Sequence, residues 1–346
     1  MDRKMKFGVG VVGLGWVSGE HLKAFRQNPH CEVVAVCARD IARAKAVAHD
    51  IGPKCRPYSS YERMLADDRV DIVSICTFHP LHPEQTILAA KAGKHIAIEK
   101  PVALDLKDLK AMRDAVRKAK VKTVVSFVLR WNPLFDVIKG LLAQNALGDL
   151  YYAEVDYLHG IGRKYKQYDW NRRKEFGRSS LLTAGCHAVD GLRWFVQDEA
   201  VEVSAYANTS AGNPLDYEYP PNTVTIIKFK SGLIGKVASM VEYVGPYLFP
   251  ITIMGNAGTI RNNQVFSTKL FPGQTHYATV PTILPDSGDV SHHPFIGEIN
   301  HLVDSILHGR ECHVNLDDAV KTHEICLAAD KSAETGKPVK LPLLKD

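Results

Sequence analysis

Three polar side chains recur at helical spacing in the second half of the chain. Thr183, His187 and Asp190 lie at positions i, i+4 and i+7, which is one face of an α-helix. A face that carries a hydroxyl, an imidazole and a carboxylate is typical of the lining of a polar cavity. We expect His187 to relay a proton or to hold a ligand hydroxyl. The alternative for His187 is a histidine buried in the core. For Asp190 we favour a structural role.

A lysine stands at the end of a predicted strand. Lys100 follows the apolar run 95–99 and precedes Pro101. Its ammonium group is therefore expected to project from the carboxyl edge of a sheet, where α/β folds bind ligands. An amine in that crevice can take and return the proton of a hydroxyl group. The alternative is an exposed lysine that pairs with a carboxylate.

A glycine-containing turn follows the first apolar run. Gly13, Gly15 and Ser18 have the G-x-G-x-x-small spacing, in which main chain approaches a pyrophosphate and a helix packs closely on a strand. A strand precedes the turn and a helix-period segment follows it, so the pattern predicts a dinucleotide site at a helix N-terminus. The predicted contacts are Gly13, Gly15, Trp16 and Val17.

The second predicted strand ends in Cys37-Ala38-Arg39-Asp40. Enzymes that prefer NAD usually place an acidic residue here, against the ribose hydroxyls. Ala38 removes that carboxylate, and the Arg39 guanidinium suits a 2′-phosphate, so the sequence favours NADP slightly over NAD. The alternatives are that Arg39 stacks on adenine and that Asp40 caps the next helix.

Two further candidates and one exclusion follow from residue types. Tyr157 and His159 end a predicted strand just before a loop rich in Gly, Arg and Lys, and either could contact substrate hydroxyls. A sheet aromatic for Tyr157 and a surface histidine for His159 are equally good interpretations.

The histidines and cysteines, such as His292-His293 and Cys312-His313, lack the paired spacing of a tetrahedral site, so we expect no metal.

The candidate residues must be positioned by helices and strands. The first third of the chain alternates apolar runs with segments of helical periodicity. Such alternation is typical of βαβ units with right-handed crossovers. We predict an α/β Rossmann domain over residues 1–130. Its strands are expected at 7–13, 32–37, 72–77, 95–99 and 123–129, and its helices at 20–28, 41–51, 61–66, 83–92 and 106–118.

From residue 150 onward, strand-like runs follow one another without helices between them. We predict a second, α+β domain over 131–346 with a large, mostly antiparallel sheet. Its strands are expected at 151–158, 201–208, 223–229, 235–244 and 251–254, its helices at 181–196, 295–308 and 316–335, and a loop at 273–293. A sheet covered on one face commonly buries the other in a partner, so a homodimer or homotetramer is expected.

The segment Glu99-Lys100-Pro101, together with the glycine turn, resembles the E-K-P signature of the glucose-fructose oxidoreductase and inositol dehydrogenase family (Gfo/Idh/MocA). Residues 183–190 are similar to the family's D-x-G-x-H-x-x-D helix start, and the resemblance covers essentially the whole chain. It implies that Lys100 and His187 are catalytic and share one pocket. The implied substrate contacts are Lys100, Tyr157, His159, Thr183 and His187.

The sequence departs from the family pattern at several of these motifs. Phe78 and His79 replace Pro and Asn of T-P-N-x-x-H, and Asn171 replaces Arg of D-W-R. Thr183 replaces the first Asp of the helix motif, which leaves the substrate preference open. The cofactor contacts implied by the resemblance are Thr77, Phe78, His79, His82, Glu99, Lys100, Arg130 and Trp170.

Composition limits the partners and the compartment. The net charge is +5 and no basic stripe is interleaved with aromatics, which excludes nucleic acid as the main partner. The start lacks a signal-peptide core and no apolar run reaches membrane-spanning length. Seven cysteines without paired spacing indicate reduced core thiols. We therefore expect a cytoplasmic chain.

These features, with the resemblance, imply an NAD(P)-dependent oxidoreductase. It would transfer hydride between nicotinamide and a secondary alcohol or ketone of a sugar, sugar derivative or polyol, because the candidate site is polar. The alternatives are a redox-cycling, NAD(P)-retaining glycosidase or epimerase and a non-catalytic NAD(P)-sensing regulator. Intact Lys100 and His187 argue against the regulator. A dihydrodiol- or biliverdin-type reductase matches the polar helix face poorly.

Overall fold

The computed structural model describes residues 6–285 and 292–345, which divide into two compact units. The first unit is Met1–Val128 with Pro294–Val320, and the second is Leu129–His293 with Lys321–Asp346. The predicted domains 1–130 and 131–346 differ from these units chiefly at 294–320. A linear reading of the sequence cannot anticipate that a late helix packs on the first unit.

The first unit is built on a six-stranded parallel sheet with the strand order β3-β2-β1-β4-β5-β6. Its central strands are buried on both faces, as parallel strands between helices are. The predicted Rossmann fold is confirmed. The strands are β1 (Phe7–Val12), β2 (Cys31–Cys37), β3 (Arg56–Tyr58), β4 (Ile72–Ile75), β5 (His95–Ile98) and β6 (Thr123–Val125).

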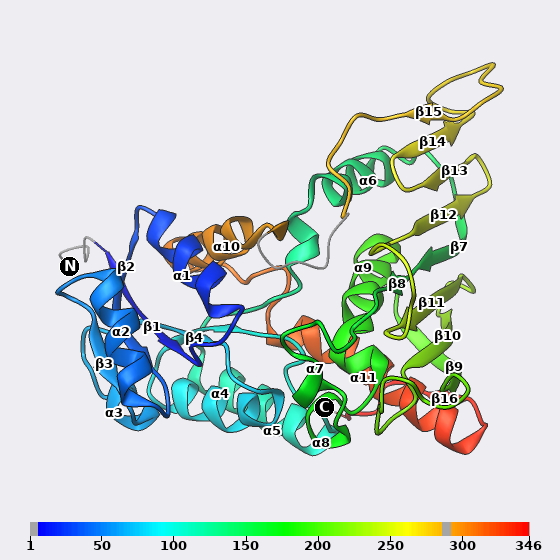
Figure 1. Cartoon of the computed structure of the whole chain (residues 1–346). Coiled ribbons are helices and arrows are strands. Elements are labelled where there is room, and N and C mark those ends of the chain that lie inside the picture. Colours follow the sequence, from blue (N-terminus) through cyan, green and yellow to red (C-terminus); the bar gives the residue numbers. More distant parts are fainter. Residues whose placement is uncertain (1–5, 286–291, 346) are drawn as a thin grey trace. The chain divides into compact units, whose positions relative to one another are not determined.

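Helices cover both faces of this sheet. Helices α1 and α10 lie side by side on one face, and α4 and α5 lie on the other (Figure 1). The ring of His21 in α1 packs at 4.9 Å from that of Phe295 in α10. The helices are α1 (Ser18–Gln27), α2 (Ile41–Ile51), α3 (Tyr61–Leu65), α4 (His82–Lys91), α5 (Leu106–Ala119) and α10 (Phe295–His308).

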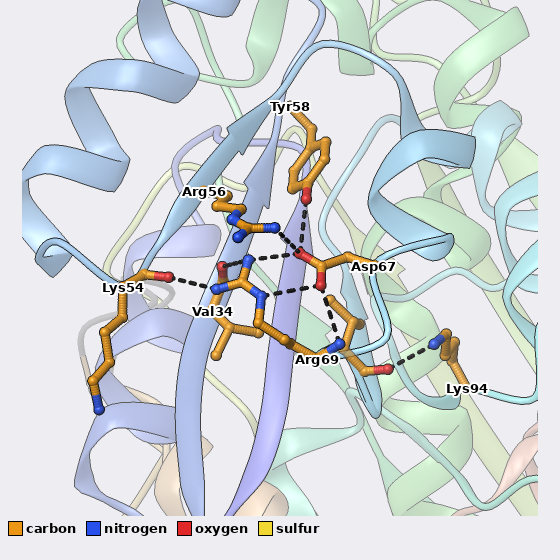
Figure 2. A network of polar contacts seen from close by, with 8 residues as sticks. Val34, Lys54, Arg56, Tyr58, Asp67, Arg69 and Lys94 are labelled. Carbon is orange, nitrogen blue, oxygen red and sulfur yellow. Dashed lines mark hydrogen bonds and ion pairs between the residues drawn. The ribbon is translucent and has the colours of Figure 1, made fainter.

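The edge strand β3 was missed because it is three residues long and contains Pro57, which only an edge strand tolerates. Asp67, in the loop before β4, forms hydrogen bonds that link side chains at this edge of the sheet (Figure 2). Both of its carboxylate oxygens accept from the Arg69 guanidinium, at 2.6 and 3.0 Å, and one accepts from the Tyr58 hydroxyl. The Arg69 guanidinium holds the pKa of Asp67 well below its usual range.

The second unit is built on a ten-stranded, mostly antiparallel sheet with the order β15-β14-β13-β12-β7-β11-β10-β9-β16, and β8 pairs with β11. The predicted fold class is confirmed, and only β11 pairs in parallel, with β7 and β8. The short strands β8 and β13–β16 were not separately predicted. The strands are β7 (Leu150–Val155), β8 (Tyr157–Leu158), β9 (Ala200–Asn208), β10 (Asn222–Phe229), β11 (Ile234–Met240), β12 (Ile251–Gly255), β13 (Gly258–Arg261), β14 (Gln264–Ser267), β15 (Ala278–Thr279) and β16 (Val339–Lys340).

Helix α9 (Cys186–Val196) packs on one face of this sheet, against β7 and β11 (Figure 1). A π-helical turn, η3 (Leu181–Gly185), precedes it, where the sequence predicted one continuous α-helix over 181–196. The close approach of Gly185 to β11 accompanies this turn, since a Cβ there would lie 2.5 Å from Ser239. The other helices are α6 (Pro133–Ala143), α7 (Tyr168–Asn171), α8 (Lys174–Gly177) and α11 (Leu316–Thr335), whose first residues belong to the first unit.

The predicted loop 273–293 contains β15, and its residues 286–291 lie outside the described part of the chain. All seven cysteines are buried and free, as predicted. Among the described residues, the helices all fall short of the combined length and hydropathy that a membrane span requires.

Glu298 of α10 is a buried carboxyl group within the first unit. Its side chain is fully buried, one oxygen accepts from the Ser126 hydroxyl at 2.9 Å, and the other has no partner among the described residues. Burial raises the pKa of Glu298 to about 7 from an ordinary value of 4.5. The folded protein therefore holds a proton there at pH values at which the unfolded chain has released it.

This raised pKa makes stability depend on pH with a definite sign. The contribution of protonated Glu298 to the free energy of unfolding is complete below about pH 4.5. It is lost as the pH rises through about 7, by an amount on the order of 3 kcal/mol. Glu298→Gln keeps an acceptor for Ser126 without the titration. Thermal unfolding should therefore show a gain for Glu298→Gln over wild type that grows from pH 5 to pH 8. Parallel pH profiles for the two proteins would contradict this assignment.

Candidate functional site

The glycine turn lies at the carboxyl end of β1. Gly13 has a φ of 83°, and a Cβ there would lie 2.6 Å from the main chain of Cys76, so only glycine fits. Gly15 is exposed, and no described atom lies within 4 Å of where its Cβ would stand. The Ser18 hydroxyl donates to the Gly15 carbonyl at 2.7 Å.

This turn opens helix α1 in the way a bound pyrophosphate requires. The N-cap residue Val17 provides no capping side-chain hydrogen bond to the first turn of α1, so its N–H groups are available to an anion. Trp16 and Val17 are half-buried beside the open position at Gly15. The residues present fit a dinucleotide, because the space a side chain would fill at Gly15 is free of protein.

The end of β2 carries one basic and one acidic side chain toward solvent. Arg39 is exposed, and Asp40 caps α2 by accepting from the Ala42 N–H at 2.9 Å. Arg43 was not among the predicted cofactor contacts. Its guanidinium donates to the Leu14 carbonyl within the glycine turn at 3.4 Å. Its only sequence signal is its place in the first turn of the helix after β2.

The segment after β4 is fixed by an interior histidine. His82, predicted as a cofactor contact, is fully buried, and its ring nitrogens lie 2.8 Å from the Pro101 carbonyl and 3.0 Å from the Thr77 carbonyl. Burial lowers the pKa of His82. His82 therefore links this segment to the one that carries Lys100. Of the neighbouring candidates, His79 is buried and Phe78 is exposed.

Lys100 follows β5, at the same sheet edge as the glycine turn. Val12 pairs with Ile75 and Ile75 pairs with Ile98, so the carboxyl ends of β1, β4 and β5 are in register. Two strand spacings, about 10 Å, separate β1 from β5. Lys100 is half-buried, and its N–H donates to the buried Glu99 carboxylate at 3.1 Å.

In the second unit, three of the predicted substrate contacts come together. The Tyr157 hydroxyl lies 3.1 Å from Nδ1 of His159, and the Tyr157 ring stacks on His187 with centroids 6.3 Å apart. Burial raises the pKa of Tyr157 well above its usual range. Tyr165 and Tyr247 add rings at 5.2 Å from His159. We call these five residues the ring cluster.

The helix predicted to carry Thr183, His187 and Asp190 is not α-helical throughout. Thr183 lies in the π turn, whereas His187 and Asp190 lie in α9, so α-helical spacing does not relate all three. The Thr183 hydroxyl instead donates to the side-chain oxygen of Asn171, whose carbonyl accepts from the Tyr219 hydroxyl. Thr183 and Asn171 thus form a neutral, buried pair.

Asp190 has the structural role that the sequence favoured. It accepts two hydrogen bonds from the Arg130 guanidinium, at 2.6 and 2.7 Å, and one from Thr322. The Arg130 side chain is 1 % exposed and lies over the Trp194 ring. Arg130, expected at the cofactor, forms this buried pair in the structure. Trp170 is half-buried on α7, near Phe176.

Described residues outside the predicted set also belong to these sites. Tyr165, Tyr219 and Tyr247 lie in loops outside the strands, and spacing along the chain does not indicate that they approach these residues. No group of three or more His, Cys, Asp or Glu side chains in the described ranges could hold a metal ion.

The two glycines of the turn predict opposite mutant behaviour. Gly15→Val should fold normally, because a Cβ at this position has open space around it, yet it should lose dinucleotide binding because the side chain occupies the pyrophosphate's place. Gly13→Val should fail at the folding step, because its Cβ meets the Cys76 main chain. Thermal unfolding and fluorescence titration with NADPH and NADH separate the two effects. Normal dinucleotide affinity in Gly15→Val would show that the turn is not the binding site.

Comparison with known proteins agrees with this architecture. Residues 7–127 match the model of the oxidoreductase family with an NAD-binding Rossmann fold, and residues 135–261 match the GFO/IDH/MocA C-terminal domain. A trans-1,2-dihydrobenzene-1,2-diol dehydrogenase of Xenopus laevis is 30% identical over 200 residues, 56% of this chain and 58% of that protein. The chain spans less than two thirds of the length of the curated relatives that it matches.

Two solved structures share the whole fold. The WlbA dehydrogenase of Bordetella pertussis, in complex with NADH and UDP-GlcNAcA, has a TM-score of 0.82 and 26% identity, over 98% of this chain and 99% of that one. A levoglucosan dehydrogenase in complex with NADH has a TM-score of 0.87 and 23% identity, over 98% and 100%. With both family models matched in order along the chain, this protein belongs to the Gfo/Idh/MocA family of NAD-binding oxidoreductases.

Proposed function

We propose that this protein is an NAD(P)-dependent dehydrogenase that oxidises, or in reverse forms, a secondary alcohol of a sugar, sugar derivative or polyol. The observation that carries the proposal is Lys100 at the carboxyl edge of β5, in register with the dinucleotide turn after β1. An acid/base next to a nicotinamide site is the arrangement that alcohol oxidation needs.

Lys100 is the proposed acid/base. In the oxidation its amine takes the proton of the reacting hydroxyl, and in the reduction its ammonium returns that proton to the alkoxide oxygen. A bound nicotinamide supplies the acceptor for the hydride that leaves the same carbon. Glu99 and His82 fix the main chain on both sides of Lys100, through the Lys100 N–H and the Pro101 carbonyl.

The ring cluster is the proposed substrate-binding part of the second unit. The Tyr247 hydroxyl is buried without a hydrogen-bond partner among the described residues, and a ligand hydroxyl would satisfy it. His187 and Tyr157 supply an imidazole and a phenol for neighbouring hydroxyls. Thr183 brings no charge, so we expect His187 rather than a carboxylate to assist proton transfer on this side.

We propose NADP(H) as a cofactor at least as good as NAD(H). Arg39 is exposed after β2, and the adjacent Asp40 carboxylate is engaged as a helix cap. Arg43 supplies a second guanidinium at the turn. A 2′-phosphate would therefore meet positive rather than negative charge.

A second candidate substrate is a dihydrodiol that carries an apolar ring. The ring cluster favours it, because aromatic side chains pack well on a flat ring, and the dihydrodiol dehydrogenases are relatives at 30% identity or more. The polar helix face that argued against this substrate in the sequence does not exist as predicted. Sugars and dihydrodiols both present vicinal secondary hydroxyls, so one assay covers both.

We propose that the open face of the ten-stranded sheet joins two copies of the chain. Tyr206, Ile226 and Ile234 lie on this face with 82%, 43% and 36% exposure, more apolar surface than a solvated sheet face needs. Sedimentation velocity should show a dimer or tetramer for wild type and smaller species for Tyr206→Glu. A monomeric wild type would refute this interface.

The function is tested by following nucleotide reduction against hexoses, glycosides, inositols, uronic acids and a trans-dihydrodiol. We expect turnover with at least one polyhydroxylated compound, and NADP⁺ to serve at least as well as NAD⁺. Lys100→Met should lower turnover by roughly 10² to 10⁴-fold with nucleotide affinity nearly unchanged. His187→Ala should also lower it, and the double variant should lose less than the product of the single losses.

Three outcomes would contradict parts of this proposal. Wild-type turnover in Lys100→Met would remove the lysine from the mechanism. A ten-fold preference for NAD⁺, about 1.4 kcal/mol, would remove the argument from Arg39. Tight nucleotide binding without reduction by any compound would favour the sensing regulator. Lys107→Met, an exposed change on α5, is the matched control.

A further inference from the structure

His21 of α1 is a buried histidine for which the dehydrogenase mechanism has no use. It is completely inaccessible to solvent, and both ring nitrogens are engaged. Nε2 lies 2.9 Å from a carboxylate oxygen of Glu99, and Nδ1 lies 3.0 Å from the Ser74 hydroxyl. His21 follows Ser18, the last residue of the glycine motif, by three residues. One side chain therefore connects the helix after the cofactor turn to the residue before Lys100.

The charges of this pair follow from its surroundings. Burial lowers the pKa of His21, but the hydrogen bond and charge of Glu99 outweigh burial and raise it. Burial raises the pKa of Glu99, and the His21 hydrogen bond and charge outweigh that effect and lower it. Both pKa shifts favour the charged forms of the pair, an imidazolium and a carboxylate.

The Glu99 carboxylate uses both oxygens. One accepts from His21 and the other accepts from the Lys100 N–H at 3.1 Å. Strand β5 ends at Ile98, so the sheet ladder no longer fixes the main chain at Lys100. The carboxylate takes over that task, and the nearby Lys100 charge helps to lower the pKa of Glu99.

Stability alone is a weak reason for such a pair. Replacing a buried ion pair by well-packed apolar side chains is often neutral or stabilising, because desolvation costs as much as the attraction returns. A pair one residue from the proposed acid/base has a use that an apolar contact lacks, since it sets both the position and the charge next to the lysine.

We propose that His21 is a positioning residue for Lys100. As an imidazolium it keeps Glu99 in the carboxylate form, and Glu99 in turn holds the Lys100 main chain. The inference rests on the proposed function only in that it gives this positioning a catalytic purpose.

The test measures Lys100 itself and needs no substrate. Trace labelling of amines with acetic anhydride at pH 8, read by peptide mass spectrometry, gives the reactivity of Lys100 relative to exposed Lys107. His21→Phe removes one of the two hydrogen bonds that fix the Glu99 carboxylate, and Glu99→Gln removes the carboxylate that accepts from the Lys100 N–H. In both variants the Lys100 amine should be labelled at least about threefold faster relative to Lys107, because the main chain that carries this half-buried side chain is no longer held in place.

Two further variants make the result specific. His21→Gln keeps a donor for Glu99 without the positive charge, so its labelling ratio should lie between wild type and His21→Phe. Lys23→Gln, an exposed change on the same helix, should leave the ratio unchanged. If His21→Phe does not fold, His21→Gln and Glu99→Gln decide the question. A wild-type ratio in both of these folded variants would overturn the proposal.

The outcomes are distinguishable from failure of the proposed function. An altered labelling ratio without turnover on any substrate would leave the positioning role standing and remove the dehydrogenase activity. An unaltered ratio together with an inactive Lys100→Met variant would remove the positioning role of His21 and leave the dehydrogenase activity standing.

Discussion

The first unit depends on β1 pairing with β2 on one side and β4 on the other. This is the point at which the strand order reverses, and a crevice opens there beyond the carboxyl ends of the strands. The pairing requires positions without side chains, since a Cβ at Gly8 would lie 1.8 Å from the Arg69 carbonyl and one at Gly13 would meet the Cys76 main chain. The dinucleotide turn and the Lys100 segment share one edge because of this constraint.

Each unit keeps a buried ion pair close to a candidate catalytic residue. Glu99 and His21 adjoin Lys100 in the first unit, and Asp190 and Arg130 lie one helical turn from His187 in the second. Buried pairs of this kind contribute little net stability, but they accept few alternative geometries because an unpaired partner costs several kcal/mol. The first pair holds the main chain at Lys100, and the second holds α9, the helix that carries His187.

The second unit determines what the proposed enzyme accepts. Its ring cluster joins imidazole and phenol groups with flat apolar surfaces, a combination that suits a ring carrying hydroxyls. The neutral pair of Thr183 and Asn171 stands where the family pattern has an acid and a base. We therefore propose that substrate preference in this chain depends on hydrogen bonding and ring contact more than on charge at that position.

The sequence alone determined the fold class, the family, the dinucleotide turn and the place of Lys100 at a strand end, because these depend on local periodicity and on glycine geometry. It also predicted that Tyr157, His159 and His187 belong together. Tertiary structure decided the rest. It placed α10 on the first unit, turned residues 181–185 into a π turn, paired Thr183 with Asn171 and joined His21 to Glu99. Those features depend on contacts between residues distant in sequence, and neither propensity nor spacing carries information about such contacts.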